Sequence, residues 1–157
     1  MIKKLLCTVI AVIIVATFSS NFVIGKHVEE IHYTGIDRVY SVYNAVTAIA
    51  DSEHVDTIMA MIAVESRGDT LAVSSTGDYG IMQVNKRVWK HKYDFNRMHE
   101  MAYGIHAGYS IYIVCYKMSN GNVRDALRLY NGSYKYADKV IGVMNVNRKS
   151  KRCNVVA

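Results

Sequence analysis

Hydrophobic residues recur at intervals of three and four along most of the chain, which is the spacing of an amphipathic helix. Between residues 36 and 50 this spacing is kept by Val39, Val42, Val46 and Ile49. It recurs in four later segments, at about 53–67, 98–118, 123–130 and 136–144, whereas residues 69–85 are rich in serine and glycine. These helices, with at most a small β-hairpin, predict a single compact, mainly α domain.

The first 25 residues follow a different pattern. Lys3 and Lys4 precede an uncharged apolar run from Leu5 to Phe18, which polar residues then interrupt. A positive start and an apolar core of this length predict a signal peptide for export to the periplasm or cell envelope. If the run is continued through Ile24 it reaches about 20 residues, the length of a retained membrane anchor. The sequence thus divides into a signal or anchor, a domain and a basic tail, at residues 1–25, 26–147 and 148–157.

Composition excludes several classes of protein. The chain has 157 residues, of which 51% are hydrophobic, too many for a disordered protein and enough for one domain. Its formal net charge is +6, and without residues 1–25 the charge is 17 − 13 = +4. This charge is spread along the chain without interleaved aromatic residues, so no nucleic-acid partner is expected. A mildly basic exported domain suits an anionic surface such as a cell wall, or the charge serves solubility alone.

The cysteines and histidines bear on redox state and metal binding. In an oxidising compartment Cys115 and Cys153 could form one disulfide, or Cys115, in an apolar helical stretch, could be a buried free thiol. The six histidines include no HExxH pattern, and His99 and His106 are too far apart on one helix to share an ion alone. We therefore expect no metal and no other cofactor.

Glu65 is the carboxylate with the most unusual position in the pattern. It follows Ile58, Met61 and Ile62 at helical spacing, which places it on the apolar stripe of its predicted helix. It also falls in the last turn, where the helix dipole disfavours a negative charge. Both effects raise the pKa of a carboxyl, and a carboxylic acid kept protonated near neutral pH is what a general acid for glycosidic cleavage requires. The alternative is a glutamate at the edge of the stripe, turned to solvent.

The residues after Glu65 favour the first interpretation. Glu65-Ser66 is followed by Gly77-Asp78-Tyr79-Gly80-Ile81-Met82-Gln83, and about fifty residues later by Tyr130-Asn131-Gly132, with Tyr136 beyond. In this order and spacing the motifs resemble those of the soluble lytic transglycosylase family, which has a lysozyme-like α+β fold. The resemblance covers roughly residues 37–145. It is closest to the small exported enzymes of secretion, conjugation and phage systems.

The resemblance implies a reaction and a set of roles. Glu65 would protonate the β-1,4 glycosidic oxygen between N-acetylmuramic acid (MurNAc) and N-acetylglucosamine (GlcNAc) in peptidoglycan. It would then act as a base on the muramyl 6-hydroxyl, which closes on the anomeric carbon to leave a 1,6-anhydro end. One carboxylate suffices because the substrate's own N-acetyl group stabilises the cationic centre, an exception to the usual pair. The residues that match the family's substrate-binding positions are Ser66, Tyr79, Met82, Gln83, Tyr130, Asn131 and Tyr136.

Two other functions are compatible with the same sequence. A hydrolytic muramidase needs a second carboxylate to activate water, and Asp69 or Asp78 could supply it. A non-catalytic wall-binding or assembly module would keep the fold, although such a protein has little reason to bury Glu65. The expected partner is the glycan strand of peptidoglycan, and a secretion, conjugation or phage machine is a candidate second partner. Membrane contact is expected only through residues 1–25.

Overall fold

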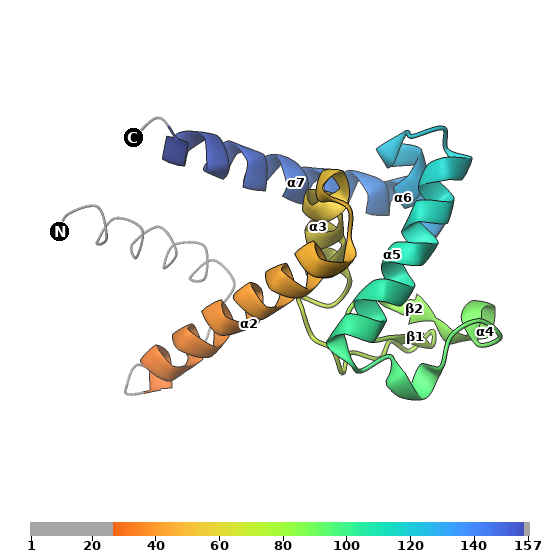
Figure 1. Cartoon of the computed structure of the whole chain (residues 1–157), viewed down its shortest axis with the longest axis horizontal. Helices are drawn as coiled ribbons and strands as arrows, with labels where there is room; N and C mark the ends of the chain where they lie inside the picture. The colour runs from red at the N-terminus through yellow and green to blue at the C-terminus, as the bar shows by residue number, and fades with distance from the viewer. Residues whose placement is uncertain (1–26, 156–157) are drawn as a thin grey trace. The chain divides into compact units, whose positions relative to one another are not determined.

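Helices make up most of the structure, which is a computed structural model (Figure 1). It describes the backbone of residues 27–155 and the side chains of residues 37–148. The predicted signal or anchor at residues 1–25 lies outside the described residues. Within the described part, no helix is both long and apolar enough to cross a membrane.

The chain divides into two units between Val39 and Tyr40, and the second unit carries all of the elements after α2 (His27–Ile49). In chain order these are the 3-10 helix η1 (Ser52–His54), α3 (Val55–Glu65), β1 (Asp78–Tyr79), β2 (Val84–Asn85), α4 (Lys86–Trp89), the 3-10 helix η2 (Phe95–Arg97), α5 (Met101–Met118), α6 (Val123–Asn131) and α7 (Tyr134–Val155).

Every helix that the hydrophobic spacing predicts is present, and the small hairpin lies within the predicted serine- and glycine-rich stretch. The ends of two helices differ from the prediction. Helix α2 begins at His27, well before residue 36, and α7 continues to Val155, through most of the predicted basic tail. The short elements α4 and η2 were not predicted, because periodicity cannot be recognised over so few residues.

The hydrophobic core forms where the four longer helices of the second unit pack together. Helix α3 packs against α7, α5 against α6, and α6 against α7, as Figure 1 also shows. Each large side chain that becomes fully buried contributes about 1.5–3 kcal/mol to stability. The largest fully buried side chains are Val46, Ile58, Met61, Ile81, Met82, Met98, Ile105, Tyr112, Leu127 and Val140.

The loop that joins the two strands, residues 80–83, points into this core rather than into solvent. Strands β1 and β2 pair antiparallel, with Asp78 opposite Asn85 and Tyr79 opposite Val84. Between them Ile81 and Met82 are completely buried. Gly80 has φ +73°, and a Cβ at this position would collide with the carbonyl oxygen of Met98. The hairpin loop therefore requires glycine at its first position both for its backbone angle and for the space.

Two glycines of α5 allow the hairpin loop to approach that helix. A Cβ on Gly108 would lie 2.5 Å from both Cβ and Sδ of Met82. A Cβ on Gly104 would lie 3.2 Å from Cγ2 of Ile81 and 3.0 Å from the carbonyl oxygen of Met98. The side chains of the loop thus occupy the volume that side chains at these two helical positions would need.

We predict that Gly108→Ala destabilises the protein, because the added methyl group overlaps Met82 and forces the hairpin loop away from α5. Overpacking of this kind costs about 1–3 kcal/mol in the free energy of unfolding, measurable by urea denaturation. Gly142→Ala in α7 is the matched control, since nothing lies within 4 Å of a Cβ there. Alanine in an open helical position should add about 0.5–1 kcal/mol of stability. A stabilising effect of both substitutions would contradict the close contact.

Candidate active site

Glu65 is the last residue of α3, and the residues after it end the helix abruptly. The N–H groups of Ser66 and Arg67 both donate to the carbonyl of Ile62 at 3.1 Å, and Arg67 and Gly68 have positive φ angles. The chain consequently reverses within two residues of Glu65, as left-handed residues at a helix C-terminus allow. This reversal leaves Glu65 at the end of a helix and partly exposed.

The hydroxyl of Ser66 ties this helix end to the hairpin loop. Its Oγ donates to the carbonyl oxygen of Ile81 at 2.8 Å and accepts from the N–H of Gly68 at 3.1 Å. The sequence predicted Ser66 as a substrate-binding residue. The structure places its hydroxyl in hydrogen bonds within the protein, where it holds the last turn of α3 against residue 81.

The carboxyl of Glu65 is in an environment that favours its protonated form. Burial raises its pKa from 4.5 to about 7. The Tyr136 hydroxyl and the Lys139 ammonium lower the pKa, and the charge of Asp78 raises it, but burial is the largest effect. The raised pKa expected from the sequence is thereby confirmed. At neutral pH a group of this kind can both donate and accept a proton.

Tyr136, on the first turn of α7, acts on Glu65 through its hydroxyl group. Its side chain is 9% exposed, and burial together with the charge of Glu65 raises its pKa far above the ordinary value. The phenol therefore stays protonated and favours the ionised form of Glu65. Among the described residues its hydroxyl has no partner in strict hydrogen-bond geometry. The polar group with which this hydroxyl interacts is the carboxyl of Glu65, and a hydrogen bond from the phenol is what lowers the pKa of Glu65.

A hydrogen bond joins Tyr130, on α6, to Met82, in the hairpin loop. The Tyr130 hydroxyl donates to the carbonyl oxygen of Met82 at 2.8 Å. Burial and the charge of Glu65 raise the pKa of Tyr130 well above its usual value. The Met82 side chain is fully buried, so its contribution to the site is made through its backbone. Asn131, the last residue of α6, is exposed, and Gly132 ends the helix with φ +89°.

Gln83 and Tyr79 lie on either side of the buried loop tip. The amide nitrogen of Gln83 donates to the carbonyl oxygens of Ala72 at 3.1 Å and Gly80 at 2.9 Å, and the residue has a left-handed φ of 48°. Its side chain is half-buried rather than fully exposed. The ring of Tyr79 meets Phe95 edge-on, with centroids 5.5 Å apart. The sequence predicted that both residues bind substrate. Gln83 is the last residue of the hairpin loop and Tyr79 directly precedes this loop, which is hydrogen-bonded to Ser66, the residue after Glu65.

The two other carboxylates considered in the sequence are engaged in turns. Asp78 accepts hydrogen bonds from Ser74 and Asn85 at 2.6 Å and from Thr76 at 2.5 Å. Burial alone would raise its pKa, but these three donors together lower it. Asp69 is exposed and accepts from the N–H of Leu71 at 2.9 Å. Asp78 is therefore ionised and close enough to influence Glu65, yet its oxygens are already hydrogen-bonded.

Sequence reasoning did not predict the influence of Lys139 on Glu65. The available signal was its position three residues after Tyr136, on the same face of a helix. The structure also bears on the thiol and metal questions. Cys115 is free and buried, whereas the side chain of Cys153 is outside the described residues. No group of three or more metal-ligating side chains occurs among residues 37–148.

Comparison with known protein families gave one match that spans most of the second unit. The model of the family described as the transglycosylase SLT domain matches residues 40–151. No match was found among curated proteins or among solved structures. The matched region contains Glu65, the hairpin and α3 to α6, together with most of α7.

We predict that Glu65→Gln changes how stability depends on pH. Below about pH 4.5 Glu65 is protonated in both the folded and the unfolded chain, so its raised pKa does not lower the free energy of unfolding. As the pH rises past 7 the unfolded chain has ionised while the folded protein resists ionisation, and the wild type loses roughly 2–3 kcal/mol relative to Glu65→Gln. Urea unfolding of both proteins at pH 4.5 and pH 8 measures this difference. Parallel pH dependence in the two proteins would contradict the raised pKa.

A second prediction concerns Tyr136→Phe. Because the Tyr136 hydroxyl lowers the pKa of Glu65, its removal should raise that pKa above about 7. An NMR titration of the glutamate side-chain carboxyl carbons, with Glu65 assigned by substitution, follows the change. Tyr134→Phe is the control, since the exposed Tyr134 hydroxyl donates to Asp125 instead. An unchanged or lowered pKa in Tyr136→Phe would show that the phenol does not act on Glu65.

Proposed function

Because the chain belongs to the transglycosylase SLT domain family, we propose that it cleaves the MurNAc–GlcNAc β-1,4 bond of peptidoglycan with Glu65 as both acid and base. Membership of this family supports peptidoglycan lytic transglycosylase activity. The bond, the product and the roles of individual residues are the proposal. The observation that carries it is a helix-terminal carboxyl whose pKa is raised to about 7, beside a protonated tyrosine.

The first step uses Glu65 as an acid. Its proton passes to the glycosidic oxygen while the bond from that oxygen to the anomeric carbon of MurNAc breaks. GlcNAc leaves with a hydroxyl at this position, and Glu65 becomes ionised. A pKa near the working pH is the condition under which an acid has enough of its protonated form and is still strong enough to donate. The N-acetyl group of MurNAc stabilises the positive charge at the anomeric carbon in place of a second carboxylate.

The second step uses the same carboxylate as a base. The 6-hydroxyl of MurNAc gives its proton to Glu65 as its oxygen forms a bond to the anomeric carbon. This ring closure leaves a 1,6-anhydro end and restores the protonated acid, so no water is consumed. Lys139 and the Tyr136 hydroxyl both favour the ionised Glu65 that exists between the two steps. Their positions support a cycle in which the carboxyl changes its charge twice.

The alternative of a hydrolytic muramidase finds less support in the geometry. It requires a carboxylate free to take a proton from water on the far side of the sugar. Asp78 has both oxygens engaged by three donors and a lowered pKa, which makes it a weak base. Asp69 is bound to the backbone of its own turn. Asp78 serves the proposed reaction better as a fixed negative charge that keeps Glu65 protonated.

The remaining predicted site residues receive roles consistent with their contacts. Ser66 and Tyr130 position the helix end and the hairpin loop, and Met82 supplies the carbonyl that Tyr130 binds. Gln83 would meet a sugar acetamide through its carbonyl oxygen, since its amide nitrogen is bound to the backbone. The exposed Asn131 and the partly exposed Tyr79 are the residues proposed to touch the glycan directly.

The proposed place of action is the cell envelope, where the substrate lies. The signal-like pattern of residues 1–25 supports export, either as a cleaved signal or as an anchor. Association with a secretion, conjugation or phage machine would direct the activity to one place in the wall. These proposals depend on the family and the sequence pattern alone.

Mass spectrometry of the fragments released from purified peptidoglycan tests the proposed reaction. We expect the wild type to release muropeptides with 1,6-anhydro ends and Glu65→Gln to release them at least about a hundredfold more slowly. Glu100→Gln is the matched control, because Glu100 is an exposed glutamate paired with Arg97 at 2.8 Å. Fragments with reducing ends would contradict transglycosylation and indicate hydrolysis. Binding to the wall without release by either protein would indicate a non-catalytic module.

A further inference from the structure

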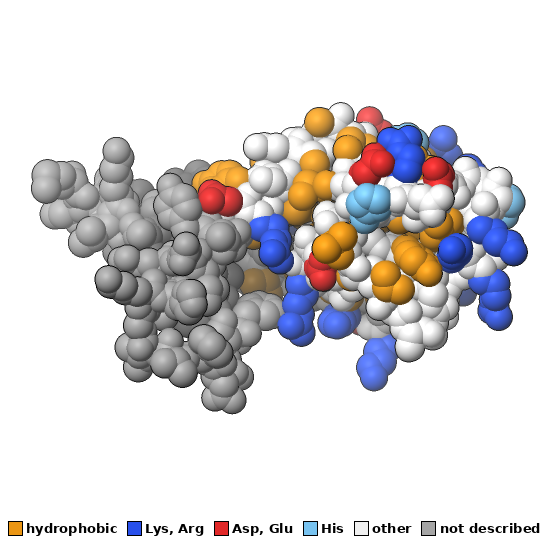
Figure 2. Space-filling view, turned by 90° about the horizontal axis from the view of Figure 1, so that it is seen from below, with side chains coloured by type: hydrophobic (Ala, Val, Ile, Leu, Met, Phe, Trp, Pro, Cys, Tyr) orange, Lys and Arg blue, Asp and Glu red, His pale blue; other side chains and the backbone are white. Residues whose placement is uncertain are grey.

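The stretch from Lys86 to Lys92 concentrates positive charge beside the candidate active site. It contains Lys86, Arg87, Lys90 and Lys92 and no acidic residue, and we refer to it as the cationic segment. Its four charges equal the whole net charge of residues 26–157, which is 17 − 13 = +4. None of the ion pairs among the described residues includes a residue of this segment. Figure 2 shows lysine and arginine side chains exposed on the face of the molecule seen there.

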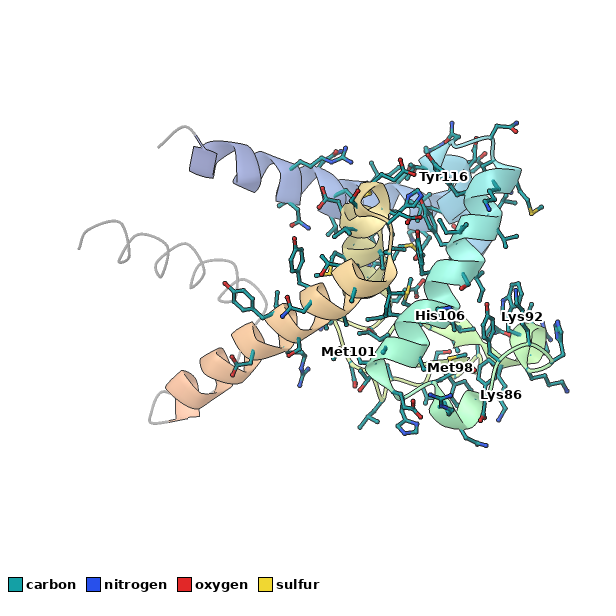
Figure 3. All side chains as sticks on the ribbon, viewed as in Figure 1. Lys86, Lys92, Met98, Met101, His106 and Tyr116 are labelled. Atoms are coloured by element: carbon teal, nitrogen blue, oxygen red, sulfur yellow. The ribbon has the colours of Figure 1, made fainter. Side chains whose placement is uncertain are left out.

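Two lysines of the cationic segment are held in place by aromatic rings. The ammonium of Lys86 lies 5.4 Å from the ring centroid of Tyr79. That of Lys92 lies 5.7 Å from the centroid of Trp89 and 5.5 Å from that of Tyr93. Figure 3 shows both lysines at the same side of the domain, around α4. A ring face orients an ammonium without occupying its conventional hydrogen-bond partners, so each of these groups remains able to donate to an anion.

Both ends of the cationic segment are connected to the neighbours of Glu65. At one end the N–H of Lys86 donates to the carbonyl oxygen of Gly77 at 2.9 Å, next to Asp78, whose charge acts on Glu65. At the other end Tyr93, which contacts Lys92, is an electrostatic neighbour of Tyr130, which is in turn a neighbour of Glu65. Lys86 therefore lies beside Tyr79 and next to the turn that carries Asp78, and Lys92 lies at the other end of the same seven-residue segment.

We propose that Lys86 and Lys92 bind carboxylates of the peptide stems of peptidoglycan, so that the enzyme prefers glycan strands that carry these peptides. The proposal rests on the proposed function and names the part of the substrate that the cations recognise. Where a stem is attached, the lactyl group of MurNAc is amide-bonded and the sugars carry no charge, whereas the stem itself carries free carboxylates. A stem of up to five residues extends roughly 17 Å from its MurNAc, so that its carboxylates can lie well away from the bond that is cut. Cations already positioned by rings lose little freedom when they bind such groups.

Cleavage of two matched substrates tests this proposal. One is peptidoglycan with its peptide stems. The other is the same material after an amidase has removed the stems, which leaves one carboxylate on the lactyl group of each MurNAc and none farther from the sugar. We expect Lys86→Gln/Lys92→Gln to lower kcat/KM on the peptide-bearing strands about three- to tenfold, mainly through KM, and to leave the bare strands unaffected. The wild-type preference for peptide-bearing strands should shrink as salt concentration rises, because exposed charge pairs are screened.

Two further variants control for net charge and for folding. Lys117→Gln removes an exposed cation at the far end of α5 and should cleave both substrates as the wild type does. Lys86→Arg/Lys92→Arg restores the charges and should restore the preference. The proposal is overturned if Lys86→Gln/Lys92→Gln cleaves peptide-bearing strands at the wild-type rate, or if its kcat/KM falls by the same factor on both substrates. If Lys86→Gln/Lys92→Gln keeps the wild-type substrate preference but no longer binds vesicles of anionic lipid, the proposal is also overturned, and the two lysines are assigned to a membrane surface. Absence of anhydro products from the wild type on both substrates would refute the proposed function itself.

Discussion

Burial of the hairpin loop, residues 80–83, is the constraint on which the arrangement of the site depends. A loop of this length usually projects into water, but here Ile81 and Met82 are as buried as any residue of the helices. Burial obliges the backbone polar groups of the loop to find partners within the protein. Ser66 donates to the carbonyl of Ile81, and Tyr130 donates to that of Met82. These two hydrogen bonds connect the end of α3 and the last turns of α6 to the hairpin loop. Glu65 directly precedes Ser66 in the chain, and its charge raises the pKa of Tyr130.

The same constraint accounts for the chemistry of Glu65. A carboxyl at an ordinary helix end would be hydrated and ionised, whereas here burial raises the pKa to about 7. The opposing influences of Asp78 on one side, and of Tyr136 and Lys139 on the other, come from different elements of the fold. The protonation of Glu65 is thus determined by how the hairpin and α7 meet the end of α3.

Much of this could be predicted from the sequence where the signal is periodic or local. The helices follow from hydrophobic spacing, and the raised pKa of Glu65 follows from its place on the apolar stripe and in the last turn. The hydrogen bonds of Ser66 and Gln83 could not be predicted, because they join residues that are distant in sequence through backbone carbonyls that no side-chain pattern reveals. The prediction that positive charge is spread along the chain without interleaved aromatic residues was wrong for the cationic segment, where four cations lie within seven residues around Trp89. The significance of this segment depends on the rings beneath two of its lysines, which only the tertiary structure brings into view.

The contact between Gly108 and Met82 has a consequence for the evolution of this sequence. Because one residue occupies the volume that the other would need, positions 82 and 108 are not free to vary independently. A lineage that acquires a larger residue on α5 at this point must first, or simultaneously, accept a smaller one in the hairpin loop. The order of such substitutions is therefore restricted. A helix that contributes no residue to the candidate site thereby limits which loops can be paired with Glu65.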